Sequence, residues 1–113
     1  MAAVNTEIHG QIMLVQLNRP DRLNALGTEL RTGLAEAFTE FKDNPDLEVA
    51  VLTGTGRAFC AGEDMKESLE RGAPGSAGHP IANPFNDGIL DKPVIAAVNG
   101  FAMGGGFMLV ERT

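Results

Sequence analysis

The chain opens with apolar and polar residues in alternation. Val4, Thr6 and Ile8 alternate with polar residues, which is typical of an edge strand, and the largely apolar segment 12–17 suits a second strand. His9-Gly10 lies between them and favours a tight turn, so we expect a β-hairpin. Asn18-Arg19-Pro20-Asp21 then ends the second strand.

A helical period follows the hairpin. Apolar residues between Leu30 and Phe41 recur at spacings of three and four, which predicts an amphipathic helix with Thr28 as its N-cap. Segments 47–53 and 94–98 are short, nearly continuous apolar runs, which suit strands buried on both faces of a parallel sheet. The order of strand, helix and strand predicts an α/β fold.

Glycine marks the remaining segments. The sequence has 14 glycines in 113 residues, about twice the usual share. We expect a loop at 54–62, a flexible loop at about 72–83, and short helices at 65–71 and 84–90. Asp64 stands three residues before Glu67, the spacing of a capping box.

Composition narrows the class of protein. The net charge of −6 and the absence of Trp and Tyr argue against a nucleic-acid partner. No apolar run is long enough to span a membrane, and the first residues lack the pattern of a signal peptide. A single cysteine, Cys60, suits a reducing compartment, so we expect a cytoplasmic protein. One cysteine and two separated histidines make no metal-ligand set.

Two segments share one design, in which a buried strand runs into a glycine-rich turn and a helix begins just after it. They are VAVLTGTGRAFCAGEDMKE at 49–67 and VIAAVNGFAMGGGFML at 94–109. Backbone N–H groups at a helix N-terminus are unpaired and carry partial positive charge. Two such ends that converge can stabilise negative charge growing on an oxygen, as an oxyanion hole does.

Three motifs, LNRPDRLNAL, GRAFCAGEDMKE and VNGFAMGGG, resemble those of the enoyl-CoA hydratase/isomerase (crotonase) family, in the family's order. The resemblance covers almost the whole chain, and the middle motif is the most specific. It implies the N-terminal portion, residues 1–113, of a single α/β domain with a crotonase-like ββα spiral. It also implies an acyl-CoA thioester as partner, no cofactor beyond the CoA of the substrate, and a homotrimer or hexamer for the full-length protein.

The resemblance also implies roles for individual residues. The backbone N–H groups of Glu63 and Gly105 would form the oxyanion hole for the thioester carbonyl. Residues that would contact CoA or the acyl channel come from all three motifs: Asp21, Arg22, Leu23, Ala25, Ala61, Asp64, Met65, Lys66, Phe101 and Gly104. Three of these features also have a simpler structural explanation. Asp64 can be a helix cap, Arg22 can be an ordinary surface charge, and the glycine triplet can serve close packing of a helix on the sheet.

The acid–base residues of the family are missing from this chain. Hydratases of the family use two glutamates, and Met108 stands at the position of the first. The second would lie about 20 residues further on, beyond Thr113, and Glu111, one helical turn after Met108, is a weak substitute. The residues therefore leave open a hydratase, an isomerase with one later base, and a truncated or non-catalytic chain that only binds acyl-CoA. A nucleotide-binding module fails because the glycine spacing fits neither dinucleotide nor P-loop motifs.

Overall fold

The largest element of the fold is a four-stranded sheet with the order β1-β2-β3-β5. The computed structural model describes residues 2–71 and 83–113. Strands β1 (Val4–His9) and β2 (Ile12–Leu17) form the predicted antiparallel hairpin. Strands β3 (Val49–Gly54) and β5 (Val94–Ala97) add to it in parallel, as the apolar runs predict.

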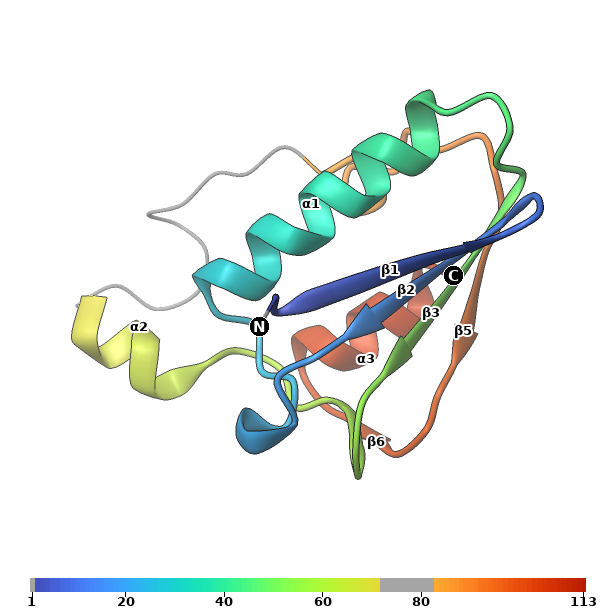
Figure 1. The fold of residues 1–113 in the computed structure, drawn as a ribbon. Coiled ribbons are helices and arrows are strands. Elements are labelled where there is room, and N and C mark those ends of the chain that lie inside the picture. Colours follow the sequence, from blue (N-terminus) through green and yellow to red (C-terminus); the bar gives the residue numbers. More distant parts are fainter. Residues whose placement is uncertain (1, 72–82) are drawn as a thin grey trace.

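Helix α1 (Thr28–Asp43) connects β2 to β3 and lies along one face of the sheet, over β1 and β2 (Figure 1). The predicted apolar stripe of this helix is its buried side, and Phe38 and Phe41 are fully buried. Phe38 also stacks on Phe85, with ring centroids 4.6 Å apart. This core fixes α1 against the sheet and so fixes the loop that leads into the helix.

The other face of the sheet is open. Burial alternates along β3, where Ala50 and Leu52 are buried and Val51 is only partly so. On β5, Val94 is buried but Ile95 is 56% exposed. The expectation that both strands are buried on two faces is therefore wrong for this chain, because its core forms on one face only.

Two ββα units stack on each other. The first is β3, β4 (Ala58–Cys60) and α2 (Met65–Arg71), and the second is β5, β6 (Phe101–Ala102) and α3 (Gly105–Glu111). Strand β4 pairs in parallel with β6, just as β3 pairs with β5. The predicted loop at 54–62 was wrong in part, because the apolar residues of β4 are buried and form a strand.

Three smaller predictions also need correction. The N-cap of α1 is Gly27, and Thr28 is the first helical residue, with no side-chain cap. The segment 84–90 forms turns without a helix, because the buried Asn83 side chain accepts the N–H groups of Phe85 and Asn86. The predicted flexible loop lies outside the described residues except for Asn83 itself, which is 4% exposed.

Candidate functional site

The three motifs meet in space. A short 3-10 helix, η1 (Pro20–Arg22), begins the loop that leads to α1, and this loop lies against the segment after β4. Ala61 N–H donates to Leu23 O at 3.0 Å, and Leu26 N–H donates to Gly62 O at 2.6 Å. From the other side, Met103 N–H donates to Cys60 O at 3.1 Å. The segment 60–64 is thus held between the first and third motifs.

The contact with Leu26 sets the direction of the Gly62–Glu63 peptide. Gly62 O accepts from Leu26, and Asp64 N–H donates back to Leu26 O at 3.3 Å, so Leu26 and Glu63 form a parallel bridge. The chain has no cis peptide bond, and in a trans peptide the C=O and the following N–H point in opposite directions. Because Gly62 O points toward Leu26, the N–H of Glu63 points away from it.

Glycine is required where the two ββα units touch. Gly62 has φ +96°, and a Cβ there would lie 2.7 Å from Met103 O and 3.5 Å from Gly105 N. A Cβ on Gly106 would lie 2.2 Å from Cys60 O. Gly104, the N-cap of α3, has φ 54° and is exposed. The glycines therefore bring the backbone of 62–63 next to the N-terminus of α3, and both the packing and the functional reading of the triplet fit this.

The positions of Glu63 and Gly105 are equivalent in the two units. Cys60 of β4 and Ala102 of β6 are register partners. Glu63 lies three residues after Cys60, and Gly105 lies three residues after Ala102. Gly105 is the first residue of α3, and its N–H makes no hydrogen bond to any described residue. The predicted pair of amides thus comes from matching points of the stacked units.

Asn24 anchors the first motif. It is fully buried with φ 56°, a left-handed conformation that asparagine tolerates better than most residues. Its Nδ2 donates to Thr55 O and Ala58 O, both at 3.0 Å, and its Oδ1 accepts from Arg19 N–H at 2.7 Å. These bonds fasten the loop to the turn before β4.

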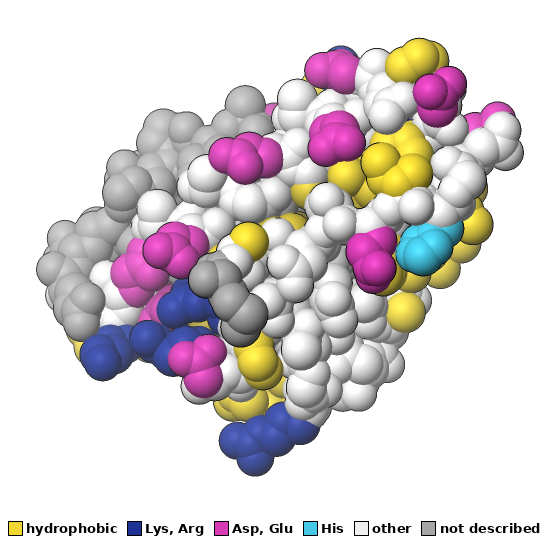
Figure 2. Space-filling model, in the orientation of Figure 1, with side chains coloured by type: hydrophobic (Ala, Val, Ile, Leu, Met, Phe, Trp, Pro, Cys, Tyr) yellow, Lys and Arg dark blue, Asp and Glu magenta, His cyan; other side chains and the backbone are white. Residues whose placement is uncertain are grey.

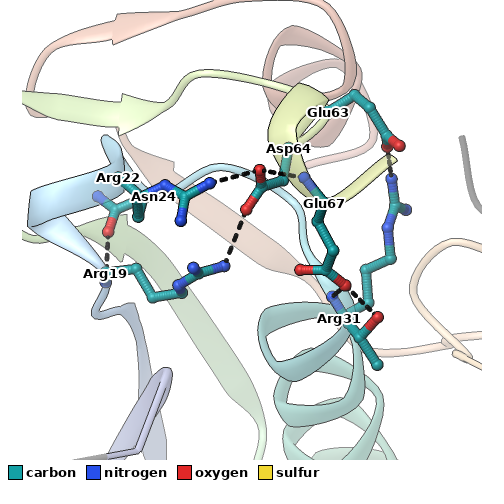
Figure 3. A network of polar contacts seen from close by, with 8 residues as sticks. Arg19, Arg22, Asn24, Arg31, Glu63, Asp64 and Glu67 are labelled. Carbon is teal, nitrogen blue, oxygen red and sulfur yellow. Dashed lines mark hydrogen bonds and ion pairs between the residues drawn. The ribbon is translucent and has the colours of Figure 1, made fainter. Parts of the chain in front are cut away.

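Asp64 is the centre of the polar contacts in Figure 3. Its side chain is 3% exposed, and Oδ1 accepts from Arg22 Nη2 at 2.7 Å and from Glu67 N–H at 3.1 Å. Oδ2 accepts from Arg19 Nη1 at 3.4 Å. The predicted cap of α2 is confirmed, and both carboxylate oxygens are occupied by protein donors.

Two more carboxylates lie close to Asp64 in Figure 3. Glu67 accepts both the N–H of Thr28, at 2.8 Å, and its hydroxyl, so the first turn of α2 is fastened to the first turn of α1. Glu63 pairs with Arg31 of α1 at 2.5 Å. Gly27 lies among them, since a Cβ there would meet Glu67 Oε2 at 2.4 Å and Arg19 Nη1 at 2.8 Å.

The network lowers the pKa values of two of its carboxyl groups, which predicts a dependence of stability on acid pH. Burial raises the pKa of Asp64, but the Glu67 N–H and the charges of Arg22 and Arg19 outweigh it and lower that pKa. The Thr28 hydroxyl lowers the pKa of Glu67 more than burial raises it. A carboxyl with a depressed folded-state pKa contributes stability above its unfolded pKa, about 4, and loses it as pH falls through the folded value.

We therefore expect the free energy of unfolding to fall below about pH 4, by up to about 1.4 kcal/mol per pH unit for each carboxyl. Urea unfolding between neutral and acid pH measures it. Asp64→Asn should reduce the fall in the free energy of unfolding below about pH 4, while Asp46→Asn, at an exposed loop acid, should leave this fall unchanged. An equal fall in wild type and in Asp64→Asn would contradict this assignment.

The other candidate residues lie around this frame with different exposures. Ala25 is buried, Leu23 and Ala61 are half-buried, and the exposed ones include Asp21, Met65, Lys66 and Phe101. Arg22 is in the network, with 33% of its side chain exposed. In Figure 2 Lys and Arg side chains gather at the end of the molecule with η1 and α2, with acidic side chains among them, and further acidic side chains lie along α1. Arg19 and Arg22 at this end are paired with Asp64.

Several other groups have simple positions. Cys60 is fully buried in the core, and burial raises the pKa of its thiol, which suits a small core residue. Among residues 2–71 and 83–113, no three His, Cys, Asp or Glu side chains gather as metal ligands. No helix in these same ranges is long and apolar enough to cross a membrane. Met108, where the resemblance predicts an acid, is 51% exposed on α3.

Sequence reasoning missed Arg19, Asn24, Gly27 and Arg31, which hold the site without facing a ligand. Only Asn24 had a recognisable signal, because asparagine tolerates the left-handed conformation of a turn better than most residues. The ion pairs of Arg19 and Arg31 join residues more than 30 positions apart, so no local pattern predicts them.

The fold and these motifs define a protein built from stacked ββα units. The Enoyl-CoA hydratase/isomerase family model matches residues 7–112, so the chain belongs to that family. The whole chain superposes on 44% of the crystal structure of an enoyl-CoA hydratase from Mycobacterium tuberculosis H37Rv, with a TM-score of 0.86 and 33% identity. The predicted family and crotonase-like fold are confirmed.

Curated relatives agree with this assignment. A carnitinyl-CoA dehydratase of Salmonella enteritidis is 45% identical over 89% of this chain and 40% of its own length. A mevalonyl-coenzyme A hydratase, sidH, of Aspergillus fumigatus is 41% identical over 89% of this chain and 38% of its own length. The chain thus spans about two-fifths of the length of these relatives.

Proposed function

We propose that this chain forms the carbonyl-binding half of an acyl-CoA hydratase or dehydratase. The backbone N–H groups of Glu63 and Gly105 donate to the thioester oxygen and stabilise the enolate that forms when water adds or leaves. The observation that carries the proposal is the convergence of the two glycine-rich segments, with Gly62 against Gly105 and the Glu63 N–H turned away from Leu26.

The chemistry needs such a pair. An acyl-CoA thioester gains negative charge on its carbonyl oxygen when a proton leaves the α-carbon or when a nucleophile adds to the β-carbon. Fixed N–H donors lower the barrier because they are already oriented toward the place where the charge develops. The same pair serves hydration, dehydration and double-bond isomerisation, which differ only in the groups that move the proton.

Hydration or dehydration is the proposed reaction because the relatives with the higher identities carry those names, carnitinyl-CoA dehydratase and mevalonyl-coenzyme A hydratase. The Lys and Arg side chains near η1 and α2 support binding of the anionic CoA nucleotide there, with Arg22 and Lys66 as contacts. Asp21, Leu23, Ala25, Ala61, Met65, Phe101 and Gly104 complete the proposed binding surface. The thioester brings its own CoA, so no separate cofactor is proposed.

A second function is favoured by Met108. A thioether moves no proton, and Met108 lies exposed on α3, one turn after Gly105, where the family places an acid. A protein that polarises the carbonyl but lacks the first acid would bind acyl-CoA without hydrating it, or would isomerise a double bond with one base elsewhere.

The test is an assay of the complete gene product that contains this chain. Crotonoyl-CoA hydration, followed by the loss of conjugated-enoyl absorbance, and isomerisation of a β,γ-unsaturated acyl-CoA should separate the two reactions. Hydration above the buffer rate supports the proposal. Calorimetric binding of acyl-CoA with neither reaction would support the non-catalytic alternative, and no binding at all would overturn both.

Assembly and location are part of the same proposal. We propose a cytoplasmic homotrimer or hexamer, supported by the family membership and by the open apolar face of the sheet, where Ile95 is 56% exposed. Light scattering of the complete gene product checks this, and a monomer at micromolar concentration would contradict it.

A further inference from the structure

Asp64 is not placed to touch a ligand, although its motif is. The carboxylate is 3% exposed, and its two oxygens accept from Arg22, Glu67 N–H and Arg19. This carboxylate already accepts from three protein donors, and its burial leaves little of it for a substrate to touch. Its function has to be sought in what it holds.

What Asp64 holds is the segment just after Glu63, whose N–H is the proposed donor. Asp64 directly follows Glu63, and its own N–H donates to Leu26 O at 3.3 Å. This bond is long for a backbone hydrogen bond, whereas the 2.6 Å bond from Leu26 N–H to Gly62 O holds the Gly62–Glu63 peptide from its other side. The Asp64 side chain holds the segment after Glu63, because it binds donors from two elements, the loop at 19–22 and the first turn of α2.

We propose that Asp64 is a positioning residue, which the guanidinium groups of Arg22 and Arg19 hold so that the Glu63 N–H stays aimed at the thioester oxygen. The inference rests on the proposed function, because it assigns a role to Asp64 in that same site. Arg22 links two tasks, since it fixes Asp64 at 2.7 Å and still exposes a third of its side chain near η1.

This role predicts a kinetic signature. A misaimed donor weakens the transition state more than the bound substrate, because the charge on the oxygen develops only during the reaction. Displacements of about 1 Å can cost about a hundredfold in rate. Asp64→Asn keeps the size of the side chain and an acceptor for Glu67 N–H but loses the charge that holds the two arginines, so kcat should fall by about 10- to 100-fold with little change in KM.

The experiment compares two substrates on the complete gene product. Crotonoyl-CoA carries the nucleotide, whereas the N-acetylcysteamine thioester of crotonate lacks it. Asp64→Asn should lower kcat by a similar factor on both substrates, and it should remove the shift of the carbonyl infrared band of a bound acyl-CoA. Asp46→Asn, an exposed acid away from the site, is the matched control and should match wild type.

Each outcome of this experiment supports or overturns either the positioning role of Asp64 or the proposed function. If Asp64→Asn raises KM for crotonoyl-CoA alone, Asp64 serves nucleotide binding and the inference is wrong. If kcat and the infrared band are unchanged in an active protein, the inference also fails. If the wild type neither turns over nor binds acyl-CoA, the proposed function fails instead.

A second variant covers the case in which Asp64→Asn does not fold. Arg22→Gln leaves Asp64 with Arg19 and its cap, and it should lower kcat on both substrates, while Arg22→Lys should recover part of that loss. An Arg22→Gln protein whose rate with the N-acetylcysteamine thioester equals wild type would overturn the positioning role.

Discussion

Gly105→Pro should lower kcat for acyl-CoA hydration by a factor of about 100 to 1,000, the loss that follows removal of one oxyanion donor. Proline has no N–H, so the substitution deletes the proposed donor at its source. Gly105 is the first residue of α3, the one helical position where proline is favoured, so the helix should persist. Steady-state rates with crotonoyl-CoA measure the effect.

Gly105→Ala is the matched control because it keeps the N–H. Its Cβ would lie 2.7 Å from Leu26 Cδ1, the end of a flexible side chain that can move aside. We expect a much smaller loss of rate for this variant. Equal losses for alanine and proline would show that bulk matters and the N–H does not, and a Gly105→Pro protein with the wild-type rate would refute the oxyanion assignment.

Gly106→Ala should destabilise the protein by roughly 1–3 kcal/mol or more, the usual range for overpacking a core. In an ordinary helix this exchange would stabilise by about 1 kcal/mol. Here the new Cβ would lie 2.2 Å from Cys60 O and 2.8 Å from Cys60 C, which belong to the backbone of β4 and cannot rotate away. Urea unfolding of the complete gene product measures the difference.

Gly33→Ala provides the contrast within the same chain. Gly33 also lies in a helix, but its added Cβ would meet the Val4 side chain, at 2.8 Å, on the edge strand β1. The edge can yield, and the gain in helix propensity offsets part of the cost. Equal destabilisation by the two variants would mean that the contact of α3 with β4 is no tighter than that of α1 with β1.

Most of the fold could be predicted because its signals are local. The hairpin, the buried stripe of α1 and the cap at Asp64 follow from periods and spacings within a few residues. Strand β4 was missed because three residues between glycines are too short to show a period. The open sheet face was missed because an apolar run shows only that a strand could be buried on both faces. Whether both faces are buried depends on where the other elements pack.

The site was predictable only through its motifs. Glycine clusters indicate close backbone approach, and Gly62 and Gly106 confirm that reading. The partners of Asp64 and Glu63 could not be predicted, since Arg22 and Arg31 come from elements that only the fold brings near. The roles of Glu63 and Gly105 in catalysis, and those of the predicted CoA contacts, remain predictions for the experiments above.

The stacking of the two ββα units has a consequence for divergence. Adjacent strands lie about 4.8 Å apart because of backbone hydrogen bonding. Glu63 and Gly105 each lie three residues after a paired position of two adjacent strands, and a Cβ on Gly62 would lie 3.5 Å from Gly105 N. Backbone contacts between the two units therefore place both proposed donors. We expect the side chains around them to vary among relatives as distant as 33% identity while the two N–H groups keep their places.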